Sequence, residues 1–62
     1  MWIKKYYIGG IEGYENNDTN DTIYVVNRHQ WEVVLNSKNI KTFSNGEDAT
    51  TFMEEHIKKE VN

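Results

Sequence analysis

The stretch TIYVVNRHQWEVVL, residues 22–35, decides the fold. Two runs of β-branched and aromatic residues flank four polar residues, a pattern typical of a β-hairpin. In a tight hairpin Val26 lies opposite Trp31 and Tyr24 opposite Val33, because opposed residues share one face of the sheet. This register predicts two sets of side chains. One face carries Tyr24, Val26, Trp31, Val33 and Leu35, and the other carries Ile23, Val25, Glu32 and Val34.

The segments on either side of this hairpin complete the sheet. Residues 2–8 are aromatic and β-rich, and residues 40–43 form a short strand after a turn at 36–39. Between the first strand and the hairpin, residues 9–21 are polar, acidic and rich in Asn and Gly, which favours an exposed loop. The sequence therefore predicts strands at about 2–8, 22–27, 31–35 and 40–43, with an acidic loop over 9–21.

After residue 45 the apolar period changes from 2 to about 3.6. The stripe predicts a helix over about 46–60, formed by Ala49, Phe52, Met53, His56, Ile57 and Val61. Asn45 is a preferred N-cap residue, and Asp48 is placed to reach back in a variant of the capping box. We therefore expect one α+β domain, a three- or four-stranded antiparallel sheet with a C-terminal helix on one face. Its core joins the Tyr24 set to Ala49, Phe52, Met53 and Ile57.

The segment from Tyr24 into the helix resembles a family of short uncharacterised bacterial and phage proteins. Their pattern is Y-x-V, a turn, W-x-V, a turn, then F-x-T-x-x-E-A. The matching residues here are Tyr24, Val26, Trp31, Val33, Phe43 and Ala49, with Asn45 in place of the usual Thr and Asp48 in place of the usual Glu. The same order of strands and helix also resembles the arm-type DNA-binding domain of phage integrases. The resemblance covers about 40 of the 62 residues and implies a ββα fold. Separately, the short, Asn- and Lys-rich, Pro-free composition is compatible with a phage or mobile-element source.

The composition argues against catalysis and metal chemistry. The chain has no Cys and two histidines, His29 in a predicted turn and His56 on the helix stripe. No nucleophile, base and orienting group can be combined from these residues, and no pair has the spacing of a zinc motif. We expect a protein that is not an enzyme and that binds no cofactor or metal. No segment is apolar enough for a membrane span or a secretory signal, so the expected location is the cytoplasm.

Two surfaces are candidates for binding a partner. One helix shields one sheet face, so Ile23, Val25 and Val34 form an apolar surface unless the first 21 residues fold over it. The second surface is acidic and comprises Glu12, Glu15, Asp18, Asp21, Glu54 and Glu55. Together they favour a small phage-encoded interaction protein, which would modulate or inhibit a host protein, such as a nucleic-acid enzyme, by mimicking DNA. The simplest partner for the apolar surface is a second copy of the chain, which would form a homodimer through this face.

A sheet-mediated DNA-binding regulator is the alternative. Its candidate residues are Lys4, Lys5, Arg28, Lys38 and Lys41. Ten acidic residues against seven basic ones give a net charge of −3. Because DNA binding depends on a basic footprint that releases counterions, nucleic acid is the less favoured partner.

Overall fold

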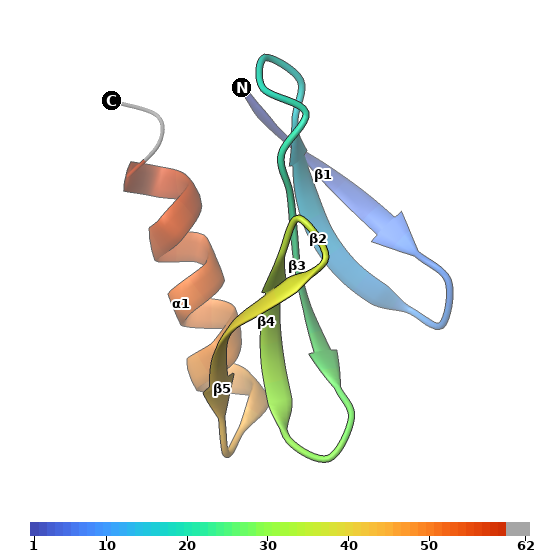
Figure 1. Cartoon of the computed structure of the whole chain (residues 1–62), viewed down its shortest axis with the longest axis vertical. Helices are drawn as coiled ribbons and strands as arrows, with labels where there is room; N and C mark the ends of the chain where they lie inside the picture. The colour runs from blue at the N-terminus through green and yellow to red at the C-terminus, as the bar shows by residue number, and fades with distance from the viewer. Residues whose placement is uncertain (60–62) are drawn as a thin grey trace.

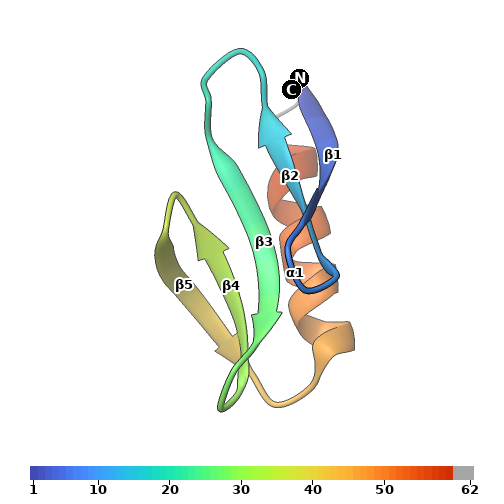
Figure 2. The same ribbon diagram turned by 90° about the vertical axis from the view of Figure 1, so that its right-hand side faces the viewer.

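The computed structural model describes residues 1–59 of the chain. Its elements are β1 (Trp2–Tyr7), β2 (Ile11–Asn16), β3 (Thr22–Asn27), β4 (Trp31–Leu35), β5 (Lys38–Phe43) and α1 (Gly46–Lys59). The strands form one antiparallel sheet in the order β1-β2-β3-β4-β5, and α1 packs on one side of β3, β4 and β5 (Figures 1 and 2). The predicted α+β class is confirmed, with five strands in place of three or four. The predicted helix positions at 60 and Val61 lie outside the described residues.

The additional strand is β2, which occupies residues 11–16 in the middle of the segment predicted as an acidic loop. Gly9 and Gly10 have φ of +84° and +78°, values that glycine adopts without a Cβ clash, and they turn β1 back into β2. Two glutamates of β2 then lie diagonally from lysines of β1, with Glu12 close to Lys4 and Glu15 close to Lys5. The prediction of a loop over 9–21 is therefore wrong, and the connecting loop is confined to residues 17–21.

The hairpin of β3 and β4 has a register one residue away from the predicted one. Asn27 pairs with Trp31, Val25 with Val33 and Ile23 with Leu35. The turn has three residues, 28–30, closed by the Arg28 N–H donating to the Gln30 carbonyl at 3.0 Å. Because side chains alternate along a strand, one residue fewer in the turn moves every β3 side chain to the opposite face.

This shift exchanges the predicted faces of β3 and leaves those of β4 unchanged. Ile23 and Val25 lie on the helix side, whereas Tyr24 and Val26 point away from it. The expectation that Tyr24 and Val26 are in the core is wrong, as is the expectation that Ile23 and Val25 lie on the other face. Val34 does point away from the helix, as predicted.

The core lies between α1 and the sheet. Ile23, Val33, Ala49 and Met53 are at most 4% exposed, and fully burying each larger apolar side chain contributes about 1.5–3 kcal/mol. Eight half-buried residues surround them: Trp2, Tyr14, Val25, Trp31, Leu35, Phe43, Phe52 and Ile57. The predicted core positions of Trp31, Val33, Leu35 and the helix residues are confirmed. A bulge between Val33 and Val34 leaves Phe43 opposite Trp31.

The start of α1 follows the predicted capping pattern. The Asp48 N–H donates to Asn45 Oδ1 at 2.8 Å, and Asn45 Nδ2 donates back to Asp48 Oδ2 at 3.1 Å. A Cβ built on Gly46 would lie 3.1 Å from three ring carbons of Trp31. The small residue at the first helical position therefore lets the helix begin directly against the indole.

Asn36 joins two turns at one end of the sheet. It lies in the two-residue β4–β5 turn, where Asn36 and Ser37 have φ of 52° and 70°. The Thr22 N–H donates to Asn36 Oδ1, and Asn36 Nδ2 donates to Asp21 Oδ1, both at 2.9 Å. Hydrogen bonds from Asn36, and then from Thr19, hold the pKa of the exposed Asp21 carboxyl below its usual value.

Candidate interaction surface

The sheet has one face that α1 does not cover, and we call it the open face. The alternation of side chains and the strand register assign its members. They are Ile3, Lys5 and Tyr7 from β1; Ile11, Gly13 and Glu15 from β2; Thr22, Tyr24 and Val26 from β3; Glu32 and Val34 from β4; and Asn39 and Thr42 from β5. Figure 1 shows this face on the side of the sheet away from the helix.

Aromatic and aliphatic groups form the centre of the open face. The rings of Tyr7 and Tyr24 lie with their centroids 5.4 Å apart and their planes inclined by 47°, a favourable tilted geometry. Beside them is a shallow groove of about 320 Å³ lined by Tyr7, Ile8, Ile11, Tyr24, Val26 and Arg28. Burial, followed by the charge of Glu15, raises the pKa of the Tyr7 hydroxyl above its ordinary value.

Two ion pairs flank this apolar centre. Lys5 Nζ lies 3.7 Å from Glu15 Oε1, and Arg28 Nη1 lies 3.9 Å from Glu32 Oε1. The open face with its flanking Arg28 thus carries two cations and two anions. It contributes nothing to the net charge of −3, which arises from the rest of the chain.

The three apolar residues predicted for this surface occupy different environments. Ile23 is fully buried beneath α1 and cannot contact a partner, and Val25 packs half-buried against the same core. Val34 faces the open side, but its exposed fraction is only 3%. Tyr24 and Val26, which the predicted register assigned to the core, occupy the open face instead. They lie there because the turn has three residues, 28–30, where the predicted register assumed four.

The six predicted acidic residues do not form one surface. Glu12 pairs with Lys4 at 3.3 Å on the helix side of the sheet, whereas Glu15 pairs with Lys5 on the open face. Asp18 pairs with the amino terminus. Asp21 is held by Asn36 in the turn region, and Glu54 and Glu55 are exposed on α1. The sequence predicted that these carboxylates form one acidic surface, but the fold distributes them over both sheet faces, a loop and the helix.

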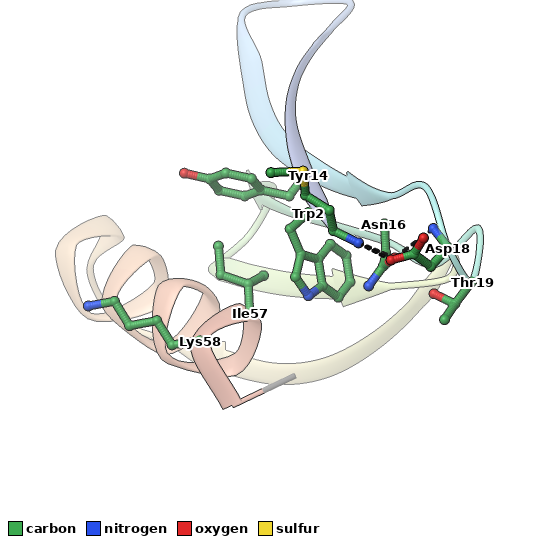
Figure 3. Close-up of a pocket in the computed structure, with 8 residues that line it drawn as sticks. Trp2, Tyr14, Asn16, Asp18, Thr19, Ile57 and Lys58 are labelled. Atoms are coloured by element: carbon green, nitrogen blue, oxygen red, sulfur yellow. Dashed lines mark hydrogen bonds and ion pairs between the residues drawn. The ribbon is translucent and has the colours of Figure 1, made fainter. Parts of the chain in front are cut away.

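A second hollow, of about 680 Å³, lies between the start of the sheet and the last described turn of α1 (Figure 3). Its walls include Trp2, Tyr14 and Ile57. At its rim the buried Asn16 accepts hydrogen bonds through Oδ1 from the Asp18 N–H at 2.9 Å and the amino terminus at 3.2 Å. The Trp2 indole Nε1 is buried and has no hydrogen-bond partner within residues 1–59. These groups hold the first strand against the β2–β3 loop, and they offer no acid–base pair.

The remaining features to place are the two histidines, any metal-binding cluster and any membrane span. His29 lies in the β3–β4 turn and His56 near the C-terminal end of α1, at opposite ends of the molecule (Figure 1). Within residues 1–59 no three His, Asp or Glu side chains are grouped closely enough to hold a metal ion. The helix in this described part is also too short and too polar to cross a membrane.

Comparison of the chain with protein-family models, with curated proteins and with solved structures gave no match. The resemblance to short phage proteins and integrase arm domains therefore stays a prediction. Fold, register and surface chemistry are the observations on which a functional proposal rests.

Proposed function

We propose that this chain is a non-enzymatic interaction protein that docks on a protein partner through its open face. One observation carries the proposal: the Tyr7–Tyr24 pair and the adjacent groove lie on the sheet face that the only helix of the described part leaves uncovered. Protein interfaces have apolar centres enriched in Tyr and Arg and a rim of charged residues. The open face has this composition, with tyrosines at its centre and ion pairs at its flanks.

The apolar and acidic features act separately in this proposal. The open face is neutral, whereas Glu54 and Glu55 are exposed on α1, on the other side of the sheet. The apolar groups would supply contact area on the open face. The carboxylates would orient the protein toward a basic surface of a host protein, because complementary charge acts mainly on orientation and association rate. Modulation of a host protein by a phage-encoded chain therefore remains our leading proposal, with two distinct surfaces in place of one mixed surface.

Capture experiments with matched variants test the open face. Val26→Asp introduces a charge into the groove, and Thr51→Asp introduces the same charge at an exposed position of α1. We expect tagged wild-type protein and Thr51→Asp to retain the same partner from a bacterial lysate, and Val26→Asp to lose it. Circular dichroism must show that both variants remain folded. A Val26→Asp protein that captures its partner at the wild-type level would refute docking through this face.

DNA binding receives less support from the arrangement of basic groups. Lys4 and Lys5 point to opposite faces, and each has a glutamate of β2 within 4 Å. Arg28 is similarly close to Glu32. A sheet laid into a groove of DNA needs its cations on one face, free to meet phosphates. A gel-shift titration at low and high salt separates the two functions, since phosphate contacts give a steep dependence on salt.

A further inference from the structure

We propose that the open face is the interface of a homodimer, in which the occupant of the face is the open face of a second copy of this chain. The inference rests on the proposed function, because it names a partner for the same surface. It leaves the carboxylates of α1 available to a different protein. Three properties of the described residues support it: the charge balance of the face, the position of Ile8 beside the groove, and the chemistry of the β1 edge.

The charge balance makes the open face compatible with itself. In a two-fold symmetric interface the same patch meets itself, so a patch with net charge would repel its copy. Here one flank holds Lys5 with Glu15 and the other holds Arg28 with Glu32. Each flank therefore holds one cation and one anion and is neutral, so there is no net repulsion between one flank and either flank of a second copy. The rest of the molecule carries the net charge of −3, and that region would repel a second copy.

Ile8 gives the face a reciprocal contact. Its exposed fraction is 97%, the highest among the large apolar residues of the described chain. It stands at the edge of the groove that Tyr7, Ile11, Tyr24 and Val26 also line. A projecting side chain next to a groove on one face lets two copies exchange contacts, with each Ile8 entering the groove of the other chain. This exchange has the symmetry of a two-fold interface, in which Ile8 of the first chain contacts the groove of the second and Ile8 of the second contacts the groove of the first.

The edge of β1 is a poorer place for a second copy. β1 is an outer strand with unpaired backbone groups, and such edges can pair with another chain. Its centre is Lys4-Lys5. Antiparallel pairing of β1 with its own copy would bring these lysines beside those of the other chain, and like charges directly opposite are destabilising. The two-fold contact is therefore assigned to the face and not to the edge.

Sedimentation equilibrium of the purified 62-residue chain over about three decades of concentration measures the self-association. We expect a monomer–dimer equilibrium for the wild type. Ile8→Ser should weaken it by about tenfold or more, because an apolar contact is lost in both copies, and it changes an exposed turn residue with little effect on folding. Lys5→Glu should weaken it to a similar degree by giving each face a charge of about −2, and Lys5→Glu with Glu15→Lys should restore it.

Lys4→Glu is the matched control. Lys4 neighbours Lys5, is exposed to nearly the same degree (46% against 48%) and also pairs with a glutamate of β2, but it points to the other face. We expect Lys4→Glu to dimerise like the wild type. Equal weakening by Lys4→Glu and Lys5→Glu, or a wild type that is monomeric at every concentration, would overturn the homodimer. A monomeric wild type would still leave docking on another protein to be judged by the capture experiment.

Discussion

Replacing Gly13 with alanine tests the β2–β3 contact, which distinguishes the structure from the predicted loop. Gly13 is buried in β2 and lies opposite Tyr24. A Cβ built on it would lie 2.3 Å from the carbonyl oxygen of Ile23 and 2.6 Å from the Cβ of Tyr24. Both distances are far below van der Waals contact, and neither obstacle is a flexible side-chain end. The two strands must move apart to accept the methyl group.

The expected loss of stability follows from this displacement. Overpacking in a closely packed region costs about 1–3 kcal/mol, and each weakened ladder hydrogen bond adds about 1 kcal/mol. We therefore expect Gly13→Ala to lower the free energy of unfolding by about 2–4 kcal/mol. A domain of this size has about 3–9 kcal/mol in total. The melting temperature should fall by about 10–25 °C.

The sign of the effect makes the test decisive. In an unobstructed strand or loop, Gly→Ala stabilises by about 0.5–1 kcal/mol, because alanine restricts the unfolded chain. Urea denaturation followed by the fluorescence of Trp2 and Trp31 measures the difference. Gly10→Ala is a useful comparison, because its φ of +78° strains an alanine but nothing lies within 4 Å of the added Cβ. A Gly13→Ala protein as stable as the wild type, or more stable, would refute the close approach of β2 to β3.

Three further predictions concern the core, the helix cap and pH. Ile23→Ala should cost about 2–5 kcal/mol in urea denaturation because Ile23 is fully buried, whereas Val26→Ala should cost clearly less; equal losses would contradict the observed register. Asn45→Ala should lower stability by about 1 kcal/mol through loss of the N-cap, and Asn45→Ser should recover most of it in the same assay. The folded-state pKa of Asp21 lies below its unfolded value of 3.8, so its contribution is present above that value and lost as the pH falls through the folded pKa. Asn36→Ala should therefore reduce the loss of thermal stability on acidification, and an unchanged pH profile would count against this hydrogen bond.

The N-terminal half shows where local pattern fails. Glu12, Gly13 and Asn16 have low strand preference, and a local view of them favours a loop. Their strand conformation comes from neighbours distant in sequence: β1 pairs on one side, through Trp2↔Asn16 to Tyr7↔Ile11, and β3 pairs on the other. Position 13 of the strand has no room for a Cβ, because the backbone of β3 approaches Gly13 closely. Strand propensity reflects packing against such neighbours more than an intrinsic backbone preference.

The candidate surface was predictable only in part for a related reason. Apolar residues on both faces of the hairpin indicated that one helix would leave some of them outside, and the structure confirms an uncovered face. Their identity depended on turn length. One residue fewer in the turn placed Ile23 and Val25 on the helix side and Tyr24 on the open face. Val34 lies on the predicted face but is 3% exposed, so none of the three predicted residues is exposed to a partner. The acidic residues were predicted by composition, which carries no information about which face each one joins.

The sequence by itself determined the local structures of this protein: the hairpin strands, the apolar stripe of α1 and its Asn45 cap. Each depends on residues within a few positions of one another, so short-range geometry is sufficient. Only the tertiary structure decided the conformation of residues 11–16, the register of β3 on β4 and the membership of the open face. These depend on which strands meet and with how many residues between them. A strand alternates with a period of two, so a shift of a single residue reverses every side chain.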